Sequence, residues 1–303
     1  MTLAIVNTSA TIAADNVNNV FSSQDSANSP TWRVANLVAG TLVNLGTGTN
    51  TSDVNYNPFT KRFGFIRNNF AAYTEISESD IVNSVASPTL IRVVTLNGMF
   101  GDDSEGLSDV VPNFSEGGYE FWSCIENGGR VQAYNFQISE GDMFSTSPIT
   151  ITARQELTVA PTQTDNNSGA EGVDMHLWEQ KLIVVQEGQQ VNTPQAIYEM
   201  DRPVDRFTDY DAAVDAQLIV AEPWDAAAQT GDLSSCVYHA ASDTILILSD
   251  TGNAVYQYDR TGTLLSTFTI VGMGQPEGIC FHGDNLIIMG EADECMYCTY
   301  VVA

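Results

Sequence analysis

The sequence predicts an all-β protein built from several copies of one antiparallel unit. Three observations support this fold class. A motif of an acid and a glycine followed by two apolar runs recurs along the chain. The apolar runs are short and are separated by clusters of Gly, Asn, Asp and Pro. The last copy lacks one strand, which an unmatched segment near the N-terminus can supply.

The repeated unit is clearest at Ala170–Met200. A small residue and Glu171-Gly172 come first, and an apolar stretch and a polar turn follow. A second apolar run then ends in Glu187 before a third strand begins. Self-similarity at intervals of tens of residues is typical of solenoids and propellers. The copies begin, in chain order, at Thr51, Ser104, Ala170, Leu233 and Pro276.

We predict four strands in each of the first four copies and three in the last. A further strand is expected at Trp32–Val38, with Thr41–Val43 as its bent continuation. The strands predicted within the copies are Asp53–Tyr56, Arg62–Ile66, Ala71–Ile76, Leu90–Thr95, Leu107–Val111, Tyr119–Ile125, Arg130–Phe136, Ile149–Leu157, Gly172–Leu177, Lys181–Val185, Gln195–Met200, Gln217–Ala221, Ser235–His239, Thr244–Leu248, Ala254–Tyr258, Leu264–Ile270, Gly278–His282, Asn285–Met289 and Met296–Val302.

The strand count predicts a five-bladed β-propeller over residues 31–303, closed by the N-terminal strand. Adding Trp32–Val38 to the last blade would remove two open sheet edges at once. Residues 1–30 are rich in Asn, Ser, Thr and Ala and are expected to form an arm that is extended or ordered by a partner. A six-bladed ring would require strands within the insertions Gly141–Ser147 and Asp201–Ala216, where we expect loops and one helical turn near residues 209–217.

The formal net charge of −27 arises mainly because the chain has only 11 basic residues. Such a surface repels phosphate, so nucleic acid and anionic membranes are poor partners, whereas divalent cations and basic protein surfaces are better ones. The N-terminus has no basic segment before its broken apolar run, and no stretch approaches the length of a membrane span. We therefore expect a soluble chain without a secretory signal.

Acidic residues recur at two positions of the unit. Within one blade, the innermost strand starts at the face of the ring where its antiparallel neighbour ends, so both sets should gather on one face. The acids that start inner strands are Glu105, Glu171 and Glu277. The acids that end second strands are Glu126, Glu187, Asp250 and Glu291.

Carboxylates about 8 Å apart repel by about 2 kcal/mol per pair at an effective dielectric constant of 20. The inner set is therefore a candidate site for a hard cation such as Ca²⁺ in the central channel, and the outer set forms an acidic rim. Two alternatives remain open. Each acid could cap backbone amides of the next blade, or the acidic face could bind a basic or polar ligand.

A shared sequence pattern recurs at Thr51–Ile66, Ala170–Met175, Asp232–Asp250, Tyr258–Ile270 and Pro276–Phe281. At these segments the chain resembles the SdiA-regulated (YjiK-like) β-propeller family. The resemblance covers roughly residues 32–303 and departs from the family pattern at Asp53, Arg67 and Ser235. It implies a propeller fold and a bound Ca²⁺, and it implies no particular reaction.

The sequence offers no catalytic constellation. The three histidines, His176, His239 and His282, stand near the ends of inner strands and are expected on the face opposite the acids. There is no G-x-S-x-G motif. Cys124, Cys236 and Cys280 are predicted to be small buried apolar residues, and the spacing of Cys295 and Cys298 within a strand argues against a metal site or a disulfide there. Trp178 and Trp224 fall in polar loops and are candidate partner contacts.

These features favour a non-catalytic interaction module. We expect a component of a phage or virus particle, in the tail, a fibre or on the capsid, anchored through residues 1–30 and able to form homo-oligomers. Outside a particle, the chain would be cytoplasmic or secreted without a signal. The alternatives are a calcium-dependent propeller hydrolase of the lactonase or phytase kind, and an exported binding protein.

Overall fold

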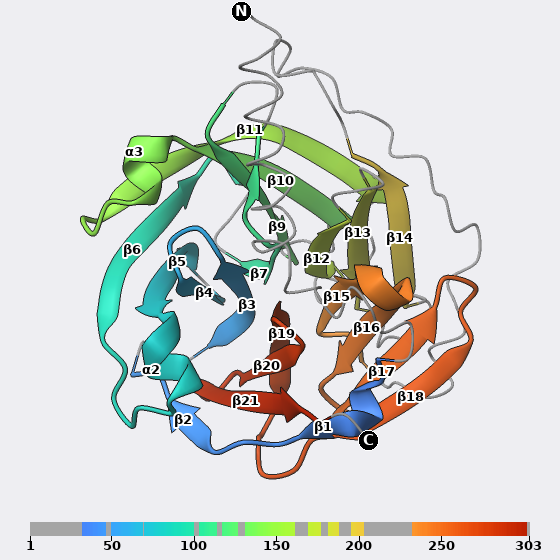
Figure 1. The fold of residues 1–303 in the computed structure, drawn as a ribbon. Coiled ribbons are helices and arrows are strands. Elements are labelled where there is room, and N and C mark those ends of the chain that lie inside the picture. Colours follow the sequence, from blue (N-terminus) through green and yellow to red (C-terminus); the bar gives the residue numbers. More distant parts are fainter. Residues whose placement is uncertain are drawn as a thin grey trace, which may run out of the picture.

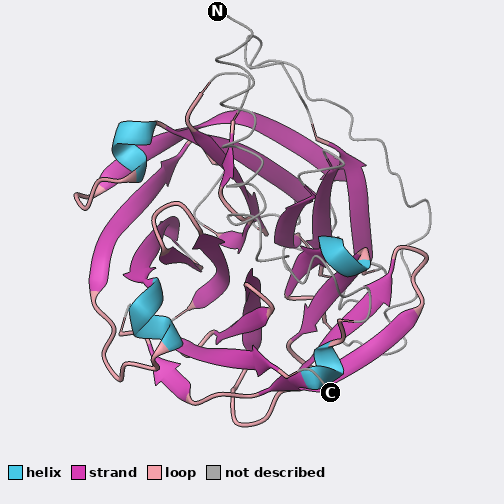
Figure 2. Cartoon of the chain, in the orientation of Figure 1, coloured by secondary structure: helices cyan, strands magenta, loops and turns pink. Residues whose placement is uncertain are grey.

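The computed structural model describes ten stretches of the chain. Their strands form four antiparallel or mixed sheets arranged around a central axis (Figures 1 and 2). No helix among the described residues is long and apolar enough to cross a membrane. The described residues are 32–46, 50–68, 70–99, 103–113, 117–126, 131–160, 169–176, 181–187, 195–202 and 232–301.

The largest sheet has nine strands and contains the first two copies of the unit. Two antiparallel meanders meet at their outer edges, where β6 and β11 pair in parallel, with Val94 opposite Ile149. This pairing covers two sheet edges that would otherwise be open. The strands are β3 (Thr51–Asn57), β4 (Arg62–Arg67), β5 (Phe70–Ser77), β6 (Leu90–Asn97), β7 (Ser104–Leu107), β8 (Val111–Pro112), β9 (Tyr119–Ile125), β10 (Val131–Ile138) and β11 (Ile149–Ala160).

The other three sheets contain the remaining copies. The strands of the third copy are β12 (Ala170–His176), β13 (Lys181–Gln186) and β14 (Ala196–Asp201), and its predicted fourth strand, Gln217–Ala221, lies outside the described residues. The fourth copy has β15 (Ser235–His239), β16 (Thr244–Ser249), β17 (Ala254–Asp259) and β18 (Leu264–Thr269). The last copy has β19 (Pro276–His282), β20 (Asn285–Gly290) and β21 (Glu294–Tyr300).

Two short N-terminal strands pair with the last copy. Both β1 (Leu37–Val38) and β2 (Leu42–Asn44) run antiparallel to β21. The strand predicted at Trp32–Val38 is shorter than expected, because Val34–Asn36 forms a 3₁₀ turn, η2. The Val34 amide donates to the Gln257 side chain, which turns the chain across the junction of two sheets.

Side chains from neighbouring sheets form the core. The second strand of each copy is buried along nearly its whole length, because both faces of its sheet are covered. Five apolar clusters fill the spaces between consecutive copies of the unit. One of them joins the first copy to the last, with Phe63 and Phe65 against Ile287 and Met289. In Figure 1 the inner strands β3, β7, β12, β15 and β19 face the centre.

The glycine of the acid-glycine motif is explained by the close approach of inner strands. A Cβ atom at Gly172 would lie 2.8 Å from the Ser235 Cα, and one at Gly278 would lie 2.7 Å from the Asp53 Cα. Both contacts are with the backbone of the next inner strand, which cannot move aside without widening the ring.

Replacing either glycine with alanine should therefore destabilise the fold. We expect Gly172→Ala and Gly278→Ala each to lower the free energy of unfolding by about 1–3 kcal/mol through overpacking. Urea denaturation measures this change. The matched control is Gly274→Ala, since a Cβ at Gly274 meets nothing within 4 Å. An unchanged midpoint for both motif variants would contradict this explanation of the repeat.

Two short helices were not predicted from the sequence. They are α2 (Glu78–Val82) and α3 (Glu140–Met143), and α3 lies in the insertion predicted to be a loop. Ser77 and Ser139 cap them by accepting hydrogen bonds from the amides of Asp80 and Asp142. The recurring sequence I-S-E-x-D, at residues 76–80 and 138–142, was the available signal.

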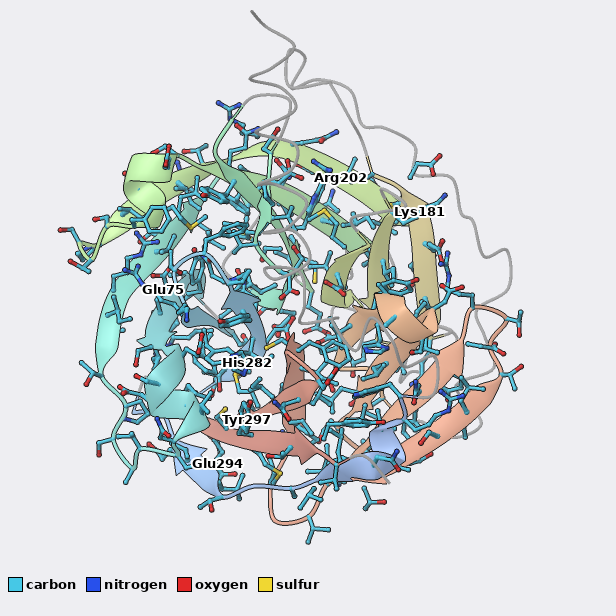
Figure 3. The ribbon with its side chains drawn as sticks, viewed as in Figure 1. Glu75, Lys181, Arg202, His282, Glu294 and Tyr297 are labelled. Carbon is cyan, nitrogen blue, oxygen red and sulfur yellow. The ribbon has the colours of Figure 1, made fainter. Side chains whose placement is uncertain are left out.

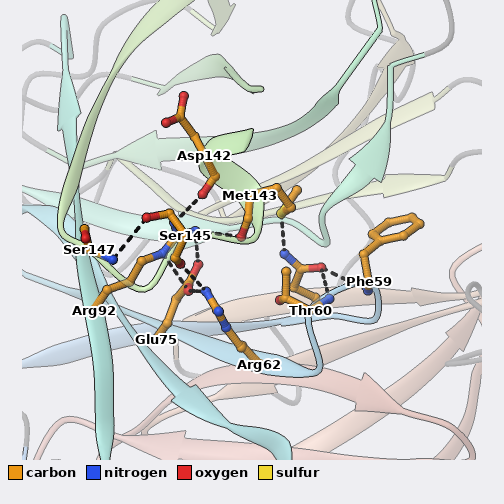
Figure 4. Close-up of polar contacts among 10 residues, drawn as sticks. Phe59, Thr60, Arg62, Glu75, Arg92, Asp142, Met143, Ser145 and Ser147 are labelled. Carbon is orange, nitrogen blue, oxygen red and sulfur yellow. Dashed lines mark hydrogen bonds and ion pairs between the residues drawn. The ribbon is translucent and has the colours of Figure 1, made fainter. Parts of the chain in front are cut away.

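The α3 helix packs against a buried network of ion-paired side chains in the first copy (Figure 4). Glu75 accepts from Arg62 at 2.7 Å and from two nitrogens of Arg92, each at 2.8 Å. Arg92 also donates to the carbonyls of Asp142 and Met143 in α3. The network therefore joins the two meanders of the nine-stranded sheet.

The buried position predicted for Cys124, Cys236 and Cys280 agrees with the structure. All five are free and buried. Cys295 packs in the cluster between the first and last copies, whereas Cys298 packs in the cluster on the other face of β21.

Candidate functional site

The acids that begin inner strands lie at irregularities of the strand pairing. The register between β12 and β13 shifts between Ala170 and Gly172, so Glu171 has no partner across the strand. The same shift occurs around Glu105 in β7 and around Glu277 in β19. A β-bulge turns its extra side chain out of the regular alternation. Here all three acids line one cavity.

The acids that end second strands reach the same place. Each is the residue that directly follows a second strand, and all four line the same cavity: Glu126, Glu187, Asp250 and Glu291. The structure thus brings together all seven acids named from the sequence. The first copy contributes Ser52 and Asn68 at the two equivalent positions.

The cavity has a volume of about 210 Å³. Its described lining contains carboxylates, hydroxyls and amides and no Lys or Arg. The position of Asp232 was not predicted, although an Asp stands two residues before the inner-strand position in two copies, at Asp103 and Asp232. The lining residues are Ser52, Asn68, Glu105, Glu126, Glu171, Glu187, Asp232, Ser234, Asp250, Gln275, Glu277 and Glu291.

Burial and mutual repulsion favour the neutral form of these acids. Burial raises the pKa of Glu105 and Glu171 well above the usual value, and neighbouring carboxylates raise it further. Burial together with Asp232 and Glu126 raises the pKa of Glu187 to about 9. Burial together with Asp250 and Asp232 raises the pKa of Glu277 to about 9. Without a bound cation, the cavity therefore retains protons at neutral pH.

Glu105 has an oxygen that is buried without a partner. The residue is 4% exposed, and among the described residues no hydrogen-bond donor reaches Oε1. A hydrogen bond with Ser52 supports the charged form of this carboxylate. A buried carboxylate oxygen without a donor is costly unless a cation or a water molecule satisfies it.

The carboxylates are not distributed evenly around the cavity. Two groups of three have ligand oxygens within 4.8 Å of one another. At about 5 Å, two carboxylate charges repel by about 3 kcal/mol at an effective dielectric constant of 20. The groups are Asp103, Glu105 and Glu126, and Glu126, Glu171 and Glu187.

The position of the acids along the sequence explains this asymmetry. The second and third copies are adjacent, and each has an acid at both positions. Glu277, which was predicted to share a central cation with Glu105 and Glu171, belongs to neither described group. The first copy, with Ser52 and Asn68, lies between the last and second copies and separates their acids.

Asp53 performs the amide-capping role that was considered for the cavity acids. Its carboxylate accepts from the amides of Val54, Leu107 and Ile279 and from the Ser235 hydroxyl. These donors come from four copies of the unit, so this buried side chain ties the inner strands together. Asp174 acts similarly by accepting from the Tyr238 amide at 2.7 Å.

The two histidines whose side chains are described do not line the acidic cavity. His239 is buried and stacks on Trp32. His282 contacts the Tyr297 hydroxyl at 2.9 Å, and the two side chains lie together in Figure 3. The side chain of His176, together with Trp178 and Trp224, lies outside the described residues.

Solved structures with a similar fold include the following three, each of which has low sequence identity to this chain. The β-propeller domain of Cps50 (Swd1) from Myceliophteria thermophila is 12% identical, with a TM-score of 0.41, 82% of this chain covered and 65% of that chain. A luciferin-regenerating enzyme is 10% identical, with a TM-score of 0.48 and coverage of 86% and 95%. A virginiamycin B lyase from Staphylococcus aureus is 13% identical, with a TM-score of 0.35 and coverage of 82% and 66%.

No curated protein matches the chain. The sequence does match the SdiA-regulated family over residues 37–293, which include every acid of the cavity. This match agrees with the resemblance found in the repeated motifs. The chain therefore belongs to the SdiA-regulated family.

Proposed function

We propose that this protein is a non-catalytic β-propeller that binds a hard divalent cation, Ca²⁺, in its acidic cavity. The observation that carries the proposal is the buried Glu105 Oε1, which has no donor among the described residues and lies in a cavity lined by carboxylates. A cation in contact with this oxygen would satisfy it and would offset the repulsion among the neighbouring acids.

The chemistry of the lining favours Ca²⁺ over other metals. Ca²⁺ takes six to eight oxygen ligands in flexible geometry, whereas Mg²⁺ requires a tighter octahedron and retains more water. The described lining offers carboxylate, amide and hydroxyl oxygens and no imidazole or thiolate, which Zn²⁺ and Cu²⁺ prefer. The inner acids come from separate sheets, and such a wide ligand set suits the larger ion.

Calorimetry with CaCl₂ tests the proposal. We expect binding with a Kd of about 10⁻⁵ M or lower. Glu105→Gln and Glu171→Gln should each weaken binding at least about 10-fold, because each removes a charged ligand. Glu140→Gln, an exposed change in α3, is the matched control and should bind as the wild type does. The absence of both binding heat and a Ca²⁺-dependent rise in Tm would refute the proposal.

The calcium-dependent hydrolase is the alternative for the same cavity. In that case, Glu171→Gln together with Glu277→Gln would abolish the turnover of lactones or phosphate esters. Under the leading proposal, wild-type protein loaded with Ca²⁺ turns over neither substrate class, and the two substitutions alter only cation affinity and stability.

We infer that the ring consists of five blades. The support is the division of the nine-stranded sheet into two meanders and the five apolar clusters between consecutive copies. We further infer that β1 and β2 complete the last blade, which is supported by their pairing with β21. In this arrangement, chain ends that are far apart in sequence share one sheet.

The role in a phage or virus particle stays a prediction from the sequence. Its support is the composition of residues 1–30, which are rich in Asn, Ser and Thr and contain no Lys or Arg, together with the strongly acidic chain. The proposed anchor, residues 1–30, lies outside the described residues. Mass spectrometry of purified particles tests this prediction.

A further inference from the structure

Glu126 belongs to both groups of closely spaced carboxylates. In one group its oxygen lies within 4.8 Å of oxygens from Asp103 and Glu105, and in the other within 4.8 Å of oxygens from Glu171 and Glu187. A carboxylate has two oxygens, so a single side chain can contact two metal ions at once. The two groups are therefore adjacent candidate positions for metal ions, and they share the Glu126 side chain.

The backbone keeps Glu126 between the two groups. Its amide donates to the Asp103 carbonyl at 3.2 Å, which holds it beside the start of β7. On its other side, Gly169 approaches so closely that a Cβ there would lie 2.4 Å from the Glu126 Cα. The Gly169 carbonyl in turn accepts from the Glu187 amide at 3.2 Å. Residues before β7, after β9 and around β12 and β13 are thus fixed relative to one another.

One divalent cation cannot serve all five carboxylates. Asp103 and Glu126 each offer a carboxylate oxygen within 4.8 Å of one from Glu105, and an ion at that position leaves Glu171 and Glu187 without a counter-charge of their own. Two divalent ions would bring four positive charges to five carboxylates. The cavity volume of about 210 Å³ also accommodates two ions with several waters, since a water occupies about 30 Å³ in the liquid.

We propose that the acidic cavity binds two divalent cations bridged by Glu126, one on the side of Asp103 and Glu105 and one on the side of Glu171 and Glu187. This inference rests on the proposed cation-binding function. Asp250, Glu277 and Glu291 line the cavity but belong to neither group, and they stay outside the coordination of the pair.

Native mass spectrometry and calorimetry with CaCl₂ count the ions. Wild-type protein at pH 8 should bind two Ca²⁺. Asp103→Asn and Glu187→Gln should each leave one tight site and weaken the other at least about 10-fold, while Glu126→Gln should weaken both. Glu140→Gln is the matched control, because Glu140 is exposed in α3 and does not line the cavity, and it should retain two.

The possible failures are distinguishable. No bound Ca²⁺ in the wild type would overturn both this inference and the proposed function. One bound Ca²⁺ would overturn the bridged pair and leave the proposed function standing. Two ions in Glu126→Gln with wild-type affinities would also overturn the bridge. Circular dichroism and the Tm of each variant establish that it is folded, and Asp103→Asn and Glu187→Gln test the pair independently of Glu126.

Discussion

Replacing Glu75 with glutamine is expected to destabilise the protein by about 3–5 kcal/mol, because it leaves two buried guanidinium groups without their shared counter-ion. The side chain of Arg92 is fully buried and that of Arg62 is 10% exposed, so water cannot replace the lost charge. Glutamine keeps the shape of the site but can accept fewer of the three hydrogen bonds that Glu75 receives.

The effect should extend beyond the first meander. Arg92 also holds the carbonyls of Asp142 and Met143, and Arg62 donates to the Ser145 carbonyl at 2.9 Å. Loosening of the guanidinium groups should therefore weaken the attachment of α3. Hydrogen exchange at the amides of residues 140–147 should become faster in Glu75→Gln, in addition to the lower urea midpoint.

Asp201→Asn is the matched control for this carboxylate-to-amide change. Asp201 pairs with Lys181 on the surface, where its side chain is 86% exposed and solvent screens the pair. We expect a change within about 0.5 kcal/mol. If Glu75→Gln unfolded at the same urea concentration as the control, the buried network would not be a significant source of stability.

The second large effect concerns pH. Metal-free protein should lose stability as the pH rises from 7 to 9, by about 2–3 kcal/mol, with a fall in Tm of about 5 °C or more. Glu187 and Glu277 have folded-state pKa values of about 9, above the ordinary value of 4.5. Their contribution to stability is complete below the unfolded-state pKa and is lost as the pH rises through the folded-state pKa.

The pH range from 7 to 9 and a control variant distinguish the cavity acids from other titratable groups. His239, whose pKa burial lowers to about 4, destabilises the fold only at lower pH, where the unfolded chain gains a proton. The double variant Glu187→Gln, Glu277→Gln cannot lose these protons, so its Tm should fall less between pH 7 and 9. Saturating Ca²⁺ should also reduce the slope in the wild type, because the ion replaces the protons.

Differential scanning calorimetry at both pH values, with EDTA and with CaCl₂, measures these changes. A metal-free wild type that gains stability over this range, or that follows the double variant at both pH values, would contradict the assignment of protons to the cavity.

The position of the acidic face was predictable because it depends only on strand direction. An acid at the start of one strand and an acid at the end of its antiparallel neighbour must lie at the same edge of a sheet. Strand direction alone therefore places Glu105, Glu126 and the other five acids at one edge, and in the structure they line one cavity. The strand positions were predictable for a different reason: short apolar runs are bounded by turn residues, as at Lys181–Gln186.

Two local features of the fold have a signature in the sequence. The serine caps of α2 and α3 are visible in the repeated I-S-E-x-D sequence, and the acid-glycine pair marks the bulge that carries each inner acid. The glycine itself is explained only in the folded ring, where its missing side chain makes room for the next inner strand.

By itself, the sequence determined the all-β class, the repeated unit, the family and the edge at which the acids gather. Only the tertiary structure decided that Asp53 joins inner strands of four copies, and that Glu126 rather than Glu277 lies within 4.8 Å of two other pairs of acids. The physical reason is that the position of an acid within the repeated unit determines only the sheet edge at which that acid lies. Ligand spacing depends instead on how closely neighbouring sheets pack, and that is determined by contacts between residues far apart in the chain.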